Sequence, residues 1–143
     1  MRFWDSSALV PLFVREAHSP AMRSLAEGDP GMIVWWASHV ECASAVHRLR
    51  RQGALTPPGA AGILETLAAL MDAAAAVQPG DAVLAKALRL LSVHQLRAAD
   101  ALQLAAALLW ARDAPGGKEL FSLDERLREA ALLEGFRVVP EVT

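Results

Sequence analysis

Short apolar runs alternate along the chain with longer segments whose apolar residues recur at helical spacing. The short runs lie at 3–4, 32–37, 120–123 and 136–139, and they have the length and β-favouring content of buried strands. The longer segments predict helices over about 6–17, 19–26, 38–53, 56–71, 80–91, 96–110 and 124–134. Residues 73–77 fit either a helix tail or a further short strand.

Polar residues mark where several of these helices begin. Ser6 and Ser19 are predicted N-caps, and Pro20 follows Ser19 at the first helical position. Ser38 and Glu41 have the Ser-x-x-Glu spacing of a capping box. Strands that alternate with helices indicate an α/β fold whose parallel sheet is covered on both faces.

Composition narrows the class of protein. At 143 residues, of which 54% are hydrophobic, the chain suits one well-packed domain, predicted over 1–143. No apolar run approaches the roughly 20 residues that cross a bilayer, and no signal-peptide layout is present, so we expect a cytoplasmic protein that does not enter a membrane. A net charge of −2 gives no overall attraction for nucleic acid, so a polyanion would need a local basic patch or bound metal ions.

Four acids carry the candidate chemistry: Asp5, Glu41, Asp100 and Asp124. Asp5 and Asp124 follow predicted parallel strands, so both are expected at the carboxyl edge of the sheet, where such folds bind ligands. Asp100 stands among alanines and leucines of a nearly apolar helix, where burying a charge is costly unless it is compensated.

Each acid also has an ordinary structural interpretation. Asp5 and Asp124 could simply cap helices, Glu41 could complete its capping box, and Arg97 could pair with Asp100 one turn away. One arrangement accounts for all four acids together, namely a single acidic pocket where helix starts and strand ends converge.

An acidic pocket implies a cation. Two carboxylates about 4 Å apart repel by about 4 kcal/mol at an effective dielectric near 20. Mg²⁺ or Mn²⁺ removes this conflict, since hard cations prefer carboxylate oxygens and water. Such ions also serve phosphodiester cleavage, because they hold a phosphate oxygen and offset charge on the leaving oxygen.

The four acidic segments resemble a known family. They are Asp5-Ser6-Ser7-Ala8-Leu9, Glu41 early in a helix, Leu96-Arg97-Ala98-Ala99-Asp100-Ala101-Leu102 and Phe121-Ser122-Leu123-Asp124. In order and spacing they resemble the motifs of PIN-domain ribonucleases, in particular the VapC-type toxins of bacterial toxin–antitoxin pairs. The resemblance implies a three-layer α/β/α sandwich around a mostly parallel sheet of four to five strands. It also implies a magnesium-dependent endoribonuclease that is usually a homodimer and is inhibited by an antitoxin protein.

The resemblance assigns roles by position. It makes Asp5, Glu41 and Asp100 the metal ligands, directly or through water, with Asp124 as a more variable fourth acid. All four are therefore predicted catalytic residues, and the hydroxyls of Ser7 and Ser122 are placed to orient a carboxylate or a water. The sequence departs from the family at Gln103, where a histidine is frequent.

Arg48, Arg50 and Arg51 form the densest basic cluster and are a weak candidate for binding RNA phosphates, since cations late in a helix also complement its dipole. An apolar groove along 63–71, or an exposed Trp35 or Trp36, could receive an antitoxin helix, although these residues could equally close the core or a dimer interface.

Two other functions compete with the nuclease. A phosphoacceptor signalling domain is also a small α/β protein with an acidic magnesium pocket, but it needs a pair of acids after the first strand, where this chain has Ser6 and Ser7. A scaffold that binds RNA or a partner without chemistry would not need all four acids.

Overall fold

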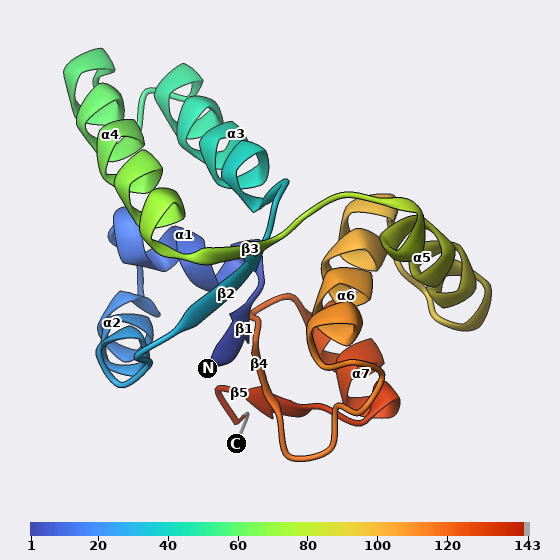
Figure 1. Cartoon of the computed structure of the whole chain (residues 1–143). Coiled ribbons are helices and arrows are strands. Elements are labelled where there is room, and N and C mark those ends of the chain that lie inside the picture. Colours follow the sequence, from blue (N-terminus) through green and yellow to red (C-terminus); the bar gives the residue numbers. More distant parts are fainter. Residues whose placement is uncertain (142–143) are drawn as a thin grey trace.

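All strands of the central sheet run in the same direction, in the order β3-β2-β1-β4-β5 (Figure 1). The computed structural model describes residues 1–141. The strands are β1 (Arg2–Trp4), β2 (Met32–Trp35), β3 (Ala75–Val77), β4 (Glu119–Phe121) and β5 (Arg137–Val139). The predicted parallel sheet is confirmed, and the ambiguous segment 73–77 supplies β3 at one edge.

Helices cover both faces of the sheet. They are α1 (Ser6–Phe13), α2 (Ser19–Glu27), α3 (Ser38–Arg51), α4 (Pro57–Ala73), α5 (Asp81–Val93), α6 (Ala98–Trp110) and α7 (Glu125–Glu134). In Figure 1, α1 to α4 lie on one side of the sheet and α5 to α7 on the other. This arrangement is the predicted three-layer α/β/α sandwich.

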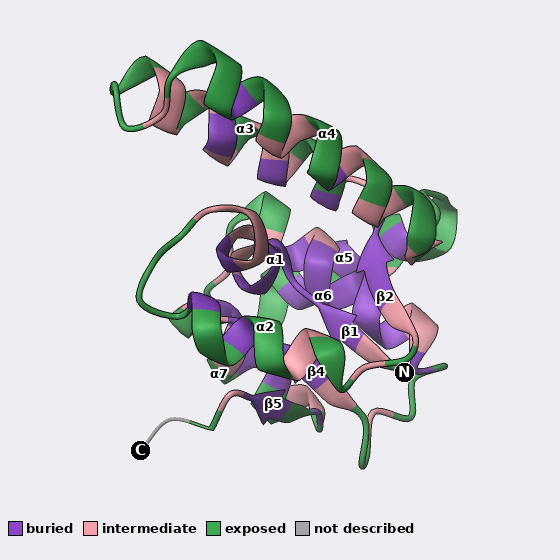
Figure 2. Ribbon diagram, turned by 90° about the vertical axis from the view of Figure 1, so that its left-hand side faces the viewer, coloured by how far each residue is buried: buried purple, intermediate pink, exposed green. Residues whose placement is uncertain are grey.

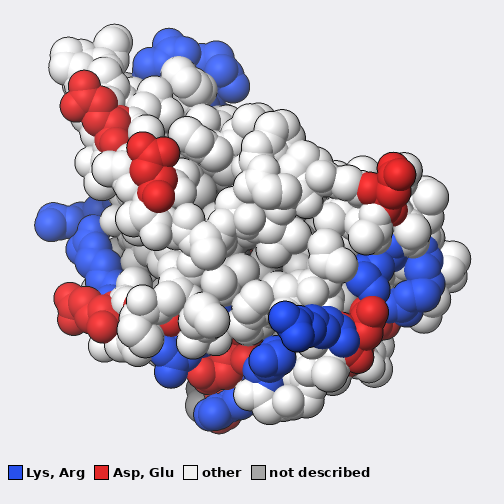
Figure 3. All heavy atoms as spheres, in the orientation of Figure 1, with Lys and Arg blue, Asp and Glu red and all other residues white. Residues whose placement is uncertain are grey.

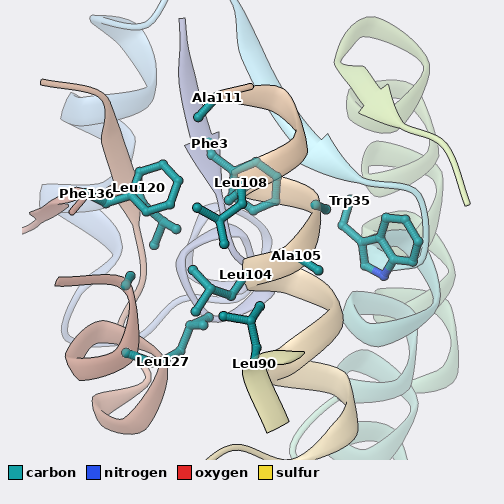
Figure 4. Close-up of a cluster of buried hydrophobic side chains, with 14 of the residues drawn as sticks. Phe3, Trp35, Leu90, Leu104, Ala105, Leu108, Ala111, Leu120, Leu127 and Phe136 are labelled. Atoms are coloured by element: carbon teal, nitrogen blue, oxygen red, sulfur yellow. The ribbon is translucent and has the colours of Figure 1, made fainter. Parts of the chain in front are cut away.

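Alternation along the strands divides the core into two clusters. Phe3 and Leu120 face α5, α6 and α7, whereas their chain neighbours Trp4 and Phe121 face α1 to α4. Figure 4 shows the first cluster, in which Phe3, Leu104, Leu108 and Leu120 pack together. Period-two alternation of this kind is what a sheet buried on both faces requires.

Helix α6 is the most buried helix of the fold (Figure 2). Its alanines at 101, 105, 106 and 107 are fully buried, and small side chains of this kind allow α6 to lie close to both the sheet and α5. An apolar surface on all sides is typical of a helix with neighbours on all sides.

Several predicted helix starts are wrong in detail. Asp5, not Ser6, is the N-cap of α1, and Ser19 lies inside α2, where its hydroxyl accepts from Glu16 N–H and donates to the Val14 carbonyl. The predicted capping box of α3 is also wrong, because Ala37 takes the N-cap position without a side-chain hydrogen bond. Ser38 and Glu41 instead bind a residue of another helix.

The exposed apolar residues lie outside these two clusters. Trp35 is buried, whereas 55% of Trp36 is exposed. Leu64, Leu67 and Leu70 of α4 pack into the core, so most of the leucine-rich segment 63–71 faces inward. None of the helices in residues 1–141 is both long and apolar enough to span a membrane.

Candidate active site

Asp5 lies at the carboxyl end of β1, at the centre of the sheet. Its backbone N–H donates to the Phe121 carbonyl of β4 at 2.9 Å, and only 4% of the residue is exposed. One carboxylate oxygen, Oδ2, accepts from the Ser7 N–H and hydroxyl at 3.3 and 2.5 Å and from the Ser122 hydroxyl at 2.9 Å. Three donors on one oxygen fix the side chain and make Asp5 the cap of α1 as well.

The second oxygen of Asp5 remains available. Among residues 1–141, Oδ1 accepts no hydrogen bond and no cation pairs with the carboxylate. Burial raises the pKa of Asp5 to about 6, although the hydrogen bonds from Ser7 and Ser122 oppose the shift. A carboxylate held this way has a free ligand atom and a cost of ionisation that a nearby cation would remove.

Glu41 reaches the same region from the first turn of α3. Its Oε2 accepts a hydrogen bond from Gln103 Nε2 of α6 at 2.9 Å. The same amide nitrogen lies 2.8 Å from the Ser6 hydroxyl and 2.9 Å from the Ser38 hydroxyl. Gln103 therefore joins the starts of α1 and α3 through one buried amide.

The environment of Glu41 disfavours its charge. Burial raises the pKa of Glu41 to about 7, the hydrogen bond from Gln103 opposes the shift, and the negative charges of Asp5 and Asp100 add to it. The other amide atom of the bridge, Gln103 Oε1, is buried without a hydrogen-bond partner in the described residues. An orphaned acceptor beside a carboxylate of raised pKa marks a site whose polar groups are not satisfied by the protein alone.

Asp100 and Asp124 line one pocket together. Asp100 lies in the first turn of α6, which begins at Ala98 rather than at residue 96 as predicted. Burial and the charge of Asp124 raise the pKa of Asp100, while the positive charges of Arg97 and Arg126 oppose the shift. Asp124 caps α7, since its Oδ1 accepts from the Leu127 N–H at 2.9 Å. The ordinary interpretation of Asp124 as a cap is therefore confirmed.

The two other structural interpretations do not hold. The carboxylate of Asp100 forms no ion pair with Arg97 or with any other cation in residues 1–141. Glu41 binds Gln103 instead of completing a capping box. The charges of Asp5 and Asp100 add to the raised pKa of Glu41, and the charge of Asp124 adds to that of Asp100, as expected for acids that lie near one another.

A pocket of about 500 Å³ opens beside Asp100 and Asp124, and Arg97 and Arg126 also line it. The predicted basic cluster of Arg48, Arg50 and Arg51 lies elsewhere, in the last turn of α3. It is part of the basic patch at the outer end of the α3 and α4 pair in Figure 3. Since an α-helix rises about 1.5 Å per residue, these arginines lie on the order of 10–15 Å along α3 from Glu41.

The model of the PIN domain family matches residues 2–133, which is nearly the whole chain. The chain belongs to the PIN domain family. PIN domains are generally metal-dependent nucleases that act on RNA, so the acids of this PIN domain lie in a fold associated with phosphodiester hydrolysis. A comparison with curated proteins finds no match.

The donor set of this PIN domain fits a hard divalent cation. All the candidate ligand atoms are oxygens, and the buried carboxylates lack a protein cation in the described residues. No three His, Cys, Asp or Glu side chains within residues 1–141 converge closely enough to hold an ion by themselves. Mg²⁺ commonly binds through one or two carboxylates and keeps several waters, so Asp5 with Asp100 or Glu41 suffices for such an ion.

Sequence reasoning missed two parts of this PIN domain site. Gln103 was a departure from a family pattern, although a glutamine three residues after Asp100 in an apolar helix must find buried partners. Arg97 entered only as a possible neutraliser of Asp100, and Arg126 did not enter at all. The signal for both was their short distance in sequence from Asp100 and Asp124.

Proposed function

We propose that this chain is a divalent-metal-dependent endoribonuclease and the toxin of a toxin–antitoxin pair, formed by one domain over residues 1–143. The observation that carries the proposal is Asp5, a buried carboxylate at the centre of the carboxyl edge with one oxygen fixed by two serines and the other without a partner in residues 1–141. Membership of a nuclease family supports it independently.

In this proposal Asp5, Glu41 and Asp100 hold Mg²⁺ or Mn²⁺, some of them through bound water, and Asp124 acts from the edge of the pocket that it shares with Asp100. The bound cation would offset charge on the phosphodiester and lower the pKa of a water. Ser7 and Ser122 keep Asp5 in one orientation through Oδ2. Gln103 holds Glu41 in the same way from α6. The chain thus supplies preorganised oxygens that need no rearrangement when the substrate binds.

RNA cleavage by the purified chain tests this proposal. We expect cleavage of a mixed RNA pool with Mg²⁺ or Mn²⁺, none after chelation with EDTA, and none from Asp100→Asn. Asp72→Asn is the matched control, because Asp72 is an exposed aspartate on α4. Cleavage that persists in EDTA, or in a folded Asp100→Asn protein, would contradict the proposal.

We further propose a cytoplasmic antitoxin partner that carries an apolar helix and a basic segment. A groove of about 510 Å³ between α1, α2 and α4 is lined by Leu12, Phe13, Ala69 and Leu70, which suits the apolar face of such a helix. Arginine in the basic segment would pair with the acids of the site, since its guanidinium binds carboxylates through two hydrogen bonds.

Co-expression with the protein encoded directly upstream tests the partner. A tag on this chain should recover an inactive complex, and Ala69→Asp should release an active enzyme because it places a charge in the groove. Ala61→Asp is the control, since Ala61 is exposed on the same helix outside the groove. Recovery of this chain alone and fully active would contradict a partner of this kind.

A homodimer completes the proposal. Leu84, Leu88 and Leu91 follow one another at helical spacing on α5 and are 54%, 59% and 41% exposed. A stripe of this kind suits a self-complementary interface across a two-fold axis. Sedimentation equilibrium should give twice the mass of one chain, and Leu88→Asp should give a single chain.

A further inference from the structure

Two arginines that form no ion pair within residues 1–141 flank the acidic site. Arg97 is the N-cap residue of α6, and Arg126 lies in the first turn of α7. Both side chains are exposed, and neither forms an ion pair in residues 1–141. Their charges act on Asp100, and both line the pocket that Asp100 and Asp124 share. Unpaired guanidinium groups beside acids are well placed to hold a polyanion next to those acids.

Arg126 lies between this pocket and a second one. Arg126 also lines a pocket of about 220 Å³, whose other lining residues are Val93, His94, Gln95, Glu129, Ala130 and Leu133. Val93 and Leu133 are 62% and 71% exposed, which gives this pocket apolar walls that nothing in residues 1–141 covers. Gln95 adds an exposed amide that can both donate and accept hydrogen bonds.

The wall of this second pocket is fixed by hydrogen bonds to Glu134. His94 Nε2 lies 2.7 Å from Glu134 Oε2, and Arg89 Nη2 donates to Glu134 Oε1 at 2.8 Å. The His94 side chain is only 7% exposed, so its ring is held in place between α5 and α7. A rigid pocket that combines apolar walls with hydrogen-bonding groups, here His94, Gln95 and Glu129, suits an unstacked nucleotide base.

We propose that Arg97 and Arg126 hold the phosphates of a single-stranded RNA beside the acids, and that the pocket of Gln95 and Leu133 receives the neighbouring base. The inference rests on the proposed ribonuclease activity and adds the path of the substrate to it. Arg126 lines both pockets, so the strand crosses from the acids to the base pocket over this one side chain. Phosphate contacts then position the strand, and the pocket supplies preference for a nucleotide.

The phosphate contacts are tested by replacing both arginines with glutamine. In an Asp5→Asn background, which prevents cleavage, Arg97→Gln with Arg126→Gln should weaken binding of a fluorescent single-stranded RNA by at least about tenfold. The slope of log affinity against log salt should fall by about 1.4, as expected for two lost phosphate contacts on a single strand.

The arginines at the outer end of α3 provide a charge-matched comparison. Arg48→Gln with Arg51→Gln removes the same charge at the distant basic patch. We expect a smaller loss of RNA affinity from this variant than from Arg97→Gln with Arg126→Gln. A larger loss of RNA affinity from the α3 variant would overturn the inference. An unchanged salt slope in Arg97→Gln with Arg126→Gln would also overturn it. If the wild-type chain still cleaves RNA in that case, the proposed function stands. A wild-type chain that neither binds nor cleaves RNA would overturn both.

Adjacent leucines test the base pocket. Leu133→Asp places a negative charge in the pocket, whereas Leu132→Asp places it on the neighbouring residue, which is 64% exposed and does not line the pocket. Cut sites mapped on a random RNA pool should lose their nucleotide preference at one flanking position in Leu133→Asp and keep it in Leu132→Asp. Identical profiles in the two variants would overturn the base pocket, since both proteins carry the same charge.

Discussion

The acids at the amino edge of the sheet have ion-pair partners, whereas those at the carboxyl edge have none among residues 1–141. At the amino edge, Arg2 Nε donates to Glu119 Oε1 at 2.7 Å, and Arg137 lies 3.7 Å from the other oxygen of Glu119. Asp29 accepts from the indole of Trp4 at 2.9 Å and also lies 3.8 Å from Arg2. Acidic and basic side chains accordingly alternate on the lower part of the surface in Figure 3, near the amino terminus of the chain.

At the carboxyl edge Asp5 is buried, and Glu41 and Asp100 are half-buried, without such partners. Asp5, Glu41 and Asp100 form no ion pair in residues 1–141, and burial is the main cause of the raised pKa of each. The same short strands thus carry neutralised charges at one end and uncompensated ones at the other. Since uncompensated buried acids reduce stability, their presence at a single edge indicates a ligand that compensates them.

Replacing one acid at each edge should give the largest difference in activity, because only the acid at the carboxyl edge is expected to hold a ligand. Asp5→Asn should lower RNA cleavage by at least about a hundredfold, because even partners that only support metal ligands contribute 10–100-fold. The metal-free variant should unfold at a higher temperature than the wild type, since a buried charge is removed. Glu119→Gln should keep its activity and lose only about 0.2–1 kcal/mol of stability, as for a partly exposed ion pair. Equal effects on activity at the two edges would contradict the comparison.

The pH dependence of stability should differ between unpaired and paired acids. The pKa of Asp5 is about 6 and that of Glu41 about 7 in the folded protein, above the ordinary values of 3.8 and 4.5. The folded form then binds more protons, so the free energy of unfolding of the metal-free protein falls as pH rises from about 4 to about 7. Asp5 alone contributes on the order of 3 kcal/mol to this fall.

Glu134 shows the opposite sign, because its hydrogen bond from Arg89 lowers its pKa. Its contribution to stability is present above the ordinary glutamate pKa of 4.5 and is lost as pH falls below that value. Urea unfolding in EDTA should therefore show a maximum of stability near about pH 4, where the gain from Glu134 ends and the fall from Asp5 and Glu41 begins. Asp5→Asn should flatten the fall toward pH 8, and a wild-type protein that gains stability from pH 5 to pH 8 would contradict the assigned pKa directions.

At the carboxyl edge the amide of Gln103, and not a cation, holds the carboxylate of Glu41 in place. Gln103→Met keeps the size of the side chain but removes the donor to Glu41, Ser6 and Ser38. We expect a loss of about 1–3 kcal/mol in stability for the unsatisfied groups. Cleavage should fall by about 10–100-fold, as for other groups that orient metal ligands. Metal affinity unchanged from the wild type would show that Gln103 has only a structural role.

Hydrophobic patterning was sufficient to predict the layers of this fold. The runs at 32–37 and 136–139, in which Arg137 is the one charged residue, contain β2 and β5. The helices follow one another along the chain in the predicted order. Residues 73–77 were ambiguous because their alanines favour a helix, whereas the pairing of β3 with β2 makes them a strand.

Local patterns were weaker guides to the site. Ser38 and Glu41 have capping-box spacing, yet Gln103, which lies 65 and 62 residues after them in sequence, competes for both side chains. That competition is tertiary, so spacing alone cannot reveal it. Arg126 likewise meets Arg97 only when α6 and α7 begin at the same pocket.

Calorimetric titration of the metal-free protein with Mg²⁺ or Mn²⁺ tests most directly whether the unpaired acids of the carboxyl edge hold a cation. Above neutral pH the wild type and Glu119→Gln should both bind the ion saturably, and Asp5→Asn should not. In the wild type near pH 6, binding should release protons, because the ion displaces them from Asp5 and Glu41. Absence of binding to the wild type, or equal binding to Asp5→Asn, would contradict the account.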